Sequence, residues 1–418
     1  MAQAENGTTR QLYFVNPTPS FPYETVTETT NLQSINFTDF SLLENQGNYL
    51  IITHPKLMQG SVNQVERYAE HRKSDLGGNY DVIVINIEEL YGQFSWGIDK
   101  HPLAIQKFVN FAIAEWNITP EYLFLLGKSV NYKDAYIPSN PTNPYKYNNC
   151  LVPSYGISPS DAMLSVPHIY TYRPQLATGR VPAKNAEEVR IYLDKMIMHD
   201  NNQFQASCNP DERLWMKNAL HIAGGNDLDE ANLFLSYLEG YRSQWEGDFM
   251  AGNIVATYNK LTEEVIETID IGDILNNGIS VLNFFGHSSG EYWALDIDAP
   301  TAYENYGKYP FIITGSCNLG DIHSYNLDNN NQLQITMPEE YLFADSLGAI
   351  GFLASASLGY PSFLNPYLET LYDNFCTENY GEAIGFCVKE TVREINNADP
   401  ENKGCLLYTS PSPRDMWT

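Results

Sequence analysis

Short apolar runs alternate with longer amphipathic segments along most of the chain. In residues 48–205, strand-like runs are followed by segments whose apolar positions recur every three or four residues. This alternation is typical of βαβ units, in which helices cover both faces of a parallel sheet. The predicted strands are 49–53, 80–85, 122–126 and 176–181, and the predicted helices are 62–73, 102–116 and 186–199.

The same alternation resumes after a polar segment, 201–211, whose Asn, Gln, Pro and Asp residues predict a linker. Within the next stretch, Thr262 can cap a helix over 262–275 that has acidic residues in its first turn. We therefore predict an α/β fold of two sequential parallel-sheet α/β/α subdomains, 48–205 and 206–400. The predicted strands of the second are 219–223, 254–257, 281–286, 310–316 and 349–354, and its helices are 229–245, 262–275, 363–375 and 382–395.

The two ends of the chain do not follow this pattern. Residues 1–47 are polar and rich in Thr, Asn and Pro, and are predicted to form an N-terminal arm. Residues 405–418 have no periodicity and resemble translated sequencing-adapter sequence, so we interpret them as a non-native tail. The start has no basic region followed by an apolar one, and hence no predicted signal peptide. No apolar stretch approaches the roughly 18 residues that cross a membrane.

The composition of the chain indicates which classes of molecule it can bind. Of 418 residues, 51 are acidic and 24 basic, which gives a net charge of −27. Such a chain repels phosphate backbones, so nucleic-acid binding is not expected, whereas a cationic substrate would be attracted. The six cysteines do not indicate a disulfide scaffold in a chain of this length, and Cys376 and Cys387 are interpreted as core residues.

The residues best suited to catalysis follow two of the predicted apolar strands. His287 comes directly after 281–286, and Cys317 comes directly after 310–316. In a parallel sheet the carboxyl ends of the strands share one edge, where sites form. An imidazole and a thiol there could meet, and a thiolate beside a base is the minimal machinery of nucleophilic acyl transfer. Small and glycine residues around Cys317 would let a substrate backbone approach.

A serine nucleophile is the competing interpretation. Residues 286–290 spell G-x-S-x-G, the nucleophile elbow of serine hydrolases, with Ser288 at its centre. An elbow should open a helix, but 291–310 looks irregular, and His323 is the one histidine downstream. The sequence therefore favours Cys317 over Ser288.

Other sites have less support. The chain contains no H-E-x-x-H, C-x-x-C or G-x-G-x-x-G motif, so neither a metal nor a dinucleotide cofactor is predicted. Trp293 lies six residues after His287 and is interpreted either as a wall of a side-chain pocket or as a packed aromatic.

These motifs together resemble the gingipain family of cysteine peptidases, which has the caspase-like α/β fold. The family combines Gly-His-Gly-Ser and a nearby Trp with a Pro-Phe-Ile strand that ends in Cys-x-x-Gly. The resemblance spans about 48–396. The matching segments are Gly286-His287-Ser288-Ser289 with Trp293, Pro310-Phe311-Ile312 with Cys317-Asn318-Leu319-Gly320, Thr178-Gly179-Arg180-Val181-Pro182, Ser160-Asp161, and 348–357.

The resemblance implies a cysteine endopeptidase that acts on proteins or peptides. It implies His287 as general base, Cys317 as nucleophile of a thioester acyl-enzyme, and the amides of Ser288 and Cys317 as oxyanion donors. Asp227 is similar to the acidic residue of the specificity pocket in arginine-cleaving members, so a basic P1 residue is expected. The family also implies a secreted or surface-exposed bacterial protein, structural calcium, and a role like that of the type IX secretion peptidases.

The chain departs from the family pattern at two places that bear on activity. The glycine after the catalytic histidine is Ser288 here. The segment that supplies an acidic partner for the histidine is shortened, and Asp229 or Glu230 could substitute. A catalytically silent binding or surface protein on the same fold is therefore the alternative, and a serine hydrolase is the second alternative.

Overall fold

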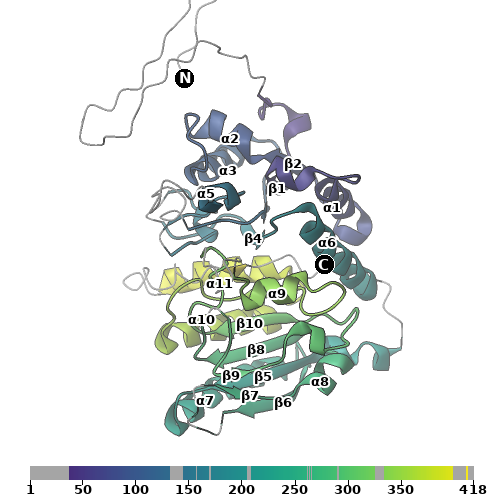
Figure 1. Cartoon of the computed structure of the whole chain (residues 1–418), viewed down its shortest axis with the longest axis vertical. Coiled ribbons are helices and arrows are strands. Elements are labelled where there is room, and N and C mark those ends of the chain that lie inside the picture. The colour runs from purple at the N-terminus through teal and green to yellow at the C-terminus, as the bar shows by residue number, and fades with distance from the viewer. Residues whose placement is uncertain are drawn as a thin grey trace, which may run out of the picture. The chain divides into compact units, whose positions relative to one another are not determined.

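The computed structural model describes residues 37–131, 145–156, 158–168, 171–204, 209–260, 262, 264, 266–289, 291–324, 334–398 and 411–412. Residues 39–418 form one compact unit that contains two mainly parallel sheets (Figure 1). Residues 1–36 of the predicted arm, and 405–410 and 413–418 of the predicted tail, lie outside the described residues.

The first sheet has four parallel strands in the order β2-β1-β3-β4. Its inner strand β1 is mostly apolar and buried at every position, as expected for a parallel strand covered on both faces. The strands are β1 (Tyr49–Thr53), β2 (Val82–Asn86), β3 (Tyr122–Leu126) and β4 (Ala177–Val181).

Helices cover both faces of this sheet because successive strand residues point to opposite sides. Leu50 and Ile52 pack in one core with Phe108 of α3, whereas Tyr49 and Ile51 belong to the other core. Helices α2 (Ile87–Phe94) and α3 (Leu103–Glu115) cover the first face, and α1 (Gln64–Lys73) and α6 (Ala186–Phe204) cover the second. A short helix, α5 (Tyr145–Asn149), lies between β3 and β4 in the chain.

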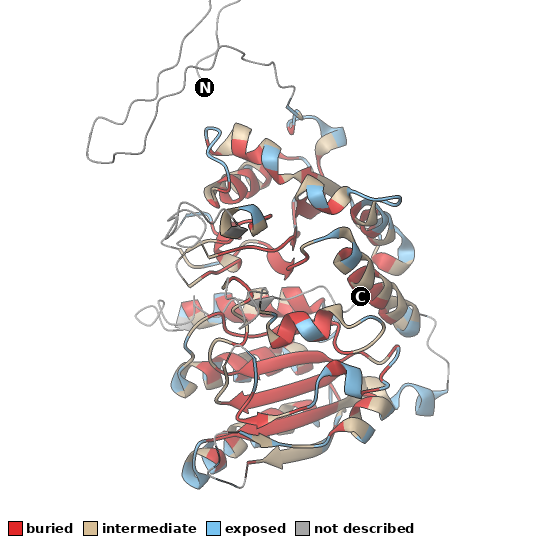
Figure 2. Ribbon diagram, in the orientation of Figure 1, coloured by how far each residue is buried: buried red, intermediate tan, exposed pale blue. Residues whose placement is uncertain are grey.

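The second sheet has the order β12-β11-β10-β8-β5-β6, parallel except for β12. Figure 2 shows that the strands at its centre are buried, and β8 and β10 are buried at every position. The strands are β5 (Asn218–Gly224), β6 (Asn253–Asn259), β8 (Val281–Gly286), β10 (Phe311–Gly315), β11 (Gly351–Leu353) and β12 (Pro411–Ser412).

Helices pack on this sheet as well. Helix α7 contacts β5, β6 and β8, and α10 contacts β10 and α7. The helices are α7 (Leu228–Trp245), α8 (Gly272–Asn277), α9 (Met337–Phe343), α10 (Pro361–Asp373), which continues as a π-helix (Asn374–Glu378), and α11 (Ile384–Ala398). None of the helices that the structure describes is both long and apolar enough to cross a membrane.

The prediction of a helix over 262–275 is wrong. Strand β7 (Glu267–Thr268) pairs there with β9 (Leu295–Asp296), and among the described residues of this segment the helical ones belong to α8. The amide of Glu267 donates to Ala294 O, and Thr262 Oγ1 bonds to the Glu267 carboxylate instead of capping a helix. The segment is rich in β-branched residues, which favour strands. Strand pairing with β9 therefore prevailed over the helix-start signal at Thr262.

Other boundaries also differ from the prediction. Helix α6 extends to Phe204, inside the predicted linker 201–211. Helices α2 and α9 were not predicted, since each is short, and α2 begins directly after β2.

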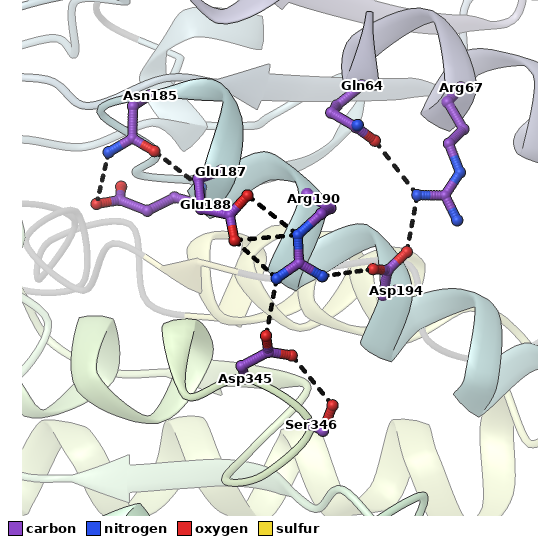
Figure 3. Close-up of polar contacts among 9 residues, drawn as sticks. All are labelled: Gln64, Arg67, Asn185, Glu187, Glu188, Arg190, Asp194, Asp345 and Ser346. Carbon is purple, nitrogen blue, oxygen red and sulfur yellow. Dashed lines mark hydrogen bonds and ion pairs between the residues drawn. The ribbon is translucent and has the colours of Figure 1, made fainter. Parts of the chain in front are cut away.

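Charged side chains tie helix α6 to the chain around α9. Figure 3 shows Arg190 of α6 between three carboxylates, those of Glu187, Asp194 and Asp345, with closest N–O distances of 2.8, 2.7 and 2.7 Å. These groups are partly exposed, so each pair contributes little. The buried Lys195 ammonium is a stronger tie, because it donates to three backbone carbonyl oxygens at 2.9–3.0 Å.

Candidate active site

Strands β8 and β10 bring the two predicted catalytic residues to one edge of the second sheet. The strands pair in parallel, and the last matched positions are Phe285 and Gly315. His287 and Cys317 each lie two residues beyond this pair, and neighbouring strands run about 4.8 Å apart. Ser288 Oγ donates to Cys317 O at 2.5 Å, so the loops that follow the strands are in contact.

Glycines at the strand ends make this edge possible. A Cβ on Gly286 would lie 2.4 Å from Gly224 O and 2.7 Å from Gly224 Cα. Any larger residue at 286 would push β5 and β8 apart directly before His287.

A carboxylate orients the imidazole. His287 Nε2 lies 2.9 Å from Glu230 Oε2, and Glu230 belongs to the first turn of α7. The Asn226 amide donates to the same Oε2 at 2.8 Å, and the Glu230 amide donates to Asp227 Oδ1 at 2.8 Å. Because a carboxylate accepts, Nε2 carries the proton and the neutral ring has its lone pair on Nδ1. Of the two acids considered from the sequence, Glu230 rather than Asp229 contacts the histidine.

Backbone groups after β11 surround the Cys317 sulfur. Sγ lies 3.3 Å from both the oxygen and the amide nitrogen of Gly359. The Asn318 amide donates to Ser357 O at 2.8 Å, and Asn318 has a left-handed φ of 55°. The segment 355–359 therefore holds the turn at Cys317 from outside the strand that precedes Cys317. The sequence reasoning missed Gly359, although small residues after a strand at the same sheet edge were a usable signal.

The predicted oxyanion donors are the backbone amides of Ser288 and Cys317. Among the described residues, neither the Ser288 amide nor the Cys317 amide donates a backbone hydrogen bond. Ser288 is not one of the residues with positive φ, so its side chain is accommodated without backbone strain. Their role toward a substrate oxyanion stays a prediction.

The two predicted pocket residues differ in their surroundings. Asp227 is exposed and caps α7 through Oδ1. Trp293 is 0% exposed, and its ring stacks on Phe284 with centroids 4.5 Å apart. A substrate would reach Trp293 only if that packing opened. The pocket role of each residue stays a prediction.

The surroundings of Ser288 lack the features of a nucleophile elbow. Ser288 forms a β-bridge with Trp293, and the described residues between β8 and β9 contain no helix. The hydroxyl of Ser288 donates to a carbonyl oxygen, and His323 is buried against Ser129 Oγ. The geometry thus favours Cys317 as nucleophile.

Comparison with known proteins identifies the family of this chain. The sequence model of Peptidase family C25 matches residues 42–412. The chain belongs to peptidase family C25. It is accordingly a cysteine peptidase of the gingipain family, as its motifs predicted. A search of curated proteins found no match.

Solved structures of this family share the fold. The chain is 17% identical to the Arg-specific cysteine proteinase gingipain R (RgpB), with a TM-score of 0.65, over 89% of this chain and 78% of that one. A complex of the RgpB pro- and mature domains from Porphyromonas gingivalis gives 16% identity and a TM-score of 0.64, over 88% and 79%. These likenesses confirm the predicted caspase-like α/β fold.

No cluster of three or more His, Cys, Asp or Glu side chains suited to a metal ion occurs among the described residues. Three described cysteines besides Cys317, namely Cys150, Cys376 and Cys387, are buried and free, which confirms the core interpretation of the last two.

Proposed function

We propose that this C25 peptidase is an endopeptidase that acts through His287 and Cys317, with Glu230 as the positioning residue for His287. The observation that carries the proposal is the register of β8 and β10, whose last paired residues, Phe285 and Gly315, each lie two residues before His287 and Cys317. The 2.9 Å contact between Glu230 and His287 Nε2 supports it, because that contact leaves Nδ1 as the base.

The mechanism follows from these groups. His287 Nδ1 takes the thiol proton, and the Cys317 thiolate attacks the scissile carbonyl carbon. The oxyanion accepts hydrogen bonds from the Ser288 and Cys317 amides, and each such donor is typically worth about 2.7–4 kcal/mol. The imidazolium then gives its proton to the leaving amine. A water molecule, deprotonated by His287, hydrolyses the remaining thioester.

A basic P1 residue is the proposed preference. Asp227 is exposed at the start of α7, three residues before Glu230, and its second carboxylate oxygen is not used by the helix cap. The net charge of −27 would also favour the approach of a cationic peptide.

Three further proposals rest on family membership alone. They are a secreted or cell-surface location in a bacterium, a role in processing secreted cargo like that of the type IX system peptidases, and a structural calcium ion. Calcium would be recognised by a fall in melting temperature on chelation that added calcium reverses.

The test is cleavage of a mixed fluorogenic peptide library, with thiol reductant and calcium, by the wild type, Cys317→Ala and Ser288→Ala. Activity that is lost only in Cys317→Ala supports the proposal, and Asp227→Asn then reports on basic P1 selection. Loss only in Ser288→Ala would assign the chemistry to the serine. No activity in the folded wild type would favour the silent binding protein.

A further inference from the structure

A cavity of about 300 Å³ lies at the edge of the second sheet opposite the active site. Val281, the first residue of β8, lines it, and so does Lys217, the residue before β5. His287 follows the other end of β8, and a strand of this length spans about 20 Å. The cavity is therefore separate from the catalytic centre.

The cavity has the composition of a small-molecule site. Its walls include Met216, Trp245, Met250, Phe375 and Ile384, which are apolar or aromatic. Its volume is at the lower end of the range typical of ligand pockets.

Two cations lie at this cavity, in a chain whose net charge is −27. Lys217 Nζ donates to Met250 O at 2.8 Å and to the Tyr380 hydroxyl at 2.6 Å, which holds the ammonium at the cavity wall. Arg213 is exposed and forms no ion pair with the described residues. Glu382 is the one acidic residue of the lining, so the two cations outnumber the anions there.

Large apolar side chains stand exposed in the segments that form the wall. Phe204 and Phe249 are each 70% exposed, and Leu214 is 57% exposed. Each is a direct chain neighbour of a lining residue, namely Gln203, Met250 and Arg213. Large exposed apolar side chains next to lining residues in the chain favour a binding role for this surface.

We propose that this cavity binds a small amphipathic carboxylate of about the size of octanoate. Its carboxylate pairs with Arg213 and Lys217, and its body lies between Met216, Met250 and Trp245. Charge complementarity fixes the head group, because a cationic head would meet two like charges. The volume favours a small ligand, since it lies at the lower end of the range typical of ligand pockets.

The experiment is calorimetric titration of the whole chain with octanoate, and with 1-octanol as the uncharged analogue of similar size. We expect saturable binding of one octanoate per chain, and octanol binding at least about tenfold weaker, because a hydrogen bond to a charged group contributes about 1.5–3 kcal/mol. Arg213→Ser and Met216→Glu should each weaken octanoate binding by a similar factor. Arg173→Ser, an exposed arginine outside the cavity, should not.

The result that overturns the proposal is no saturable octanoate binding by the folded chain at millimolar concentration. Equal affinities in Arg213→Ser, Met216→Glu and Arg173→Ser would overturn it too, because binding would then lie elsewhere. Melting temperatures without ligand show whether each variant is folded. Cys317→Ala should bind octanoate as the wild type does, so this test is independent of the proposed peptidase mechanism.

Discussion

Replacing Glu230 by Gln tests the positioning of His287 most sharply. The change keeps the size of the side chain but removes the charge that faces Nε2 across 2.9 Å. A hydrogen bond to a charged group contributes about 1.5–3 kcal/mol. Glu230 and His287 are 29% and 39% exposed, so solvent screening favours the lower half of that range. We expect kcat/KM to fall about 10–50-fold.

The loss should appear in kcat, with KM little changed, because the carboxylate acts on the base and not on bound peptide. The assay is steady-state cleavage of one fluorogenic peptide by wild type, Glu230→Gln and Asp229→Asn. Asp229 is the matched control, an exposed carboxylate one residue away in the same helix turn. A fall of less than twofold in Glu230→Gln, or an equal fall in Asp229→Asn, would refute the reasoning.

Three further predictions concern the hydroxyl at 288, a buried cation and two buried histidines. Ser288→Gly removes the hydrogen bond to Cys317 O and should lower the melting temperature by a few degrees while activity persists; abolished activity would contradict Cys317 as the proposed nucleophile. Lys195→Met leaves three carbonyl oxygens without their buried donor and should cost about 3 kcal/mol of unfolding free energy in urea titration; a cost below about 1 kcal/mol would contradict this. Burial lowers the pKa of His221 and of His323 to about 3, so each is neutral when folded and takes up a proton on unfolding below about pH 6.5. Stability should therefore fall by about 2 kcal/mol per histidine between pH 7 and pH 5; the same fall in His221→Phe and His323→Asn would contradict this origin.

Much of the fold could be predicted because both sheets are parallel and buried. Strands over 49–53 and 122–126 have the predicted bounds, since an apolar run between polar loops leaves no competing structure. The prediction for 262–275 failed because the partner strand, β9, is only two residues long and has no sequence pattern of its own. A long-range pairing of this kind cannot be inferred from local propensity.

The placement of His287 and Cys317 at one sheet edge could be predicted from the sheet-edge rule, but the groups that contact them could not. Asp227, Asp229 and Glu230 lie within one helical turn, so the sequence does not show which of them contacts His287. In the structure Asp227 accepts from the Glu230 amide at the start of α7, and Glu230 contacts His287. Gly359 contacts the sulfur because β11 lies beside β10, and the path of the loop after β11 is set by packing that no local pattern encodes.

The central claim is that His287 activates Cys317, and the rate of alkylation tests it most directly. Mass spectrometry would follow iodoacetamide labelling of each cysteine in the folded protein at neutral pH, for wild type and His287→Ala. Burial raises the pKa of both the Cys376 and Cys387 thiols to about 12, so these should label slowly. The account predicts that Cys317 labels fastest and slows about tenfold or more in His287→Ala, because a free thiol is only a few per cent thiolate at pH 7. Equal labelling of all cysteines, or an unchanged Cys317 rate in His287→Ala, would contradict it.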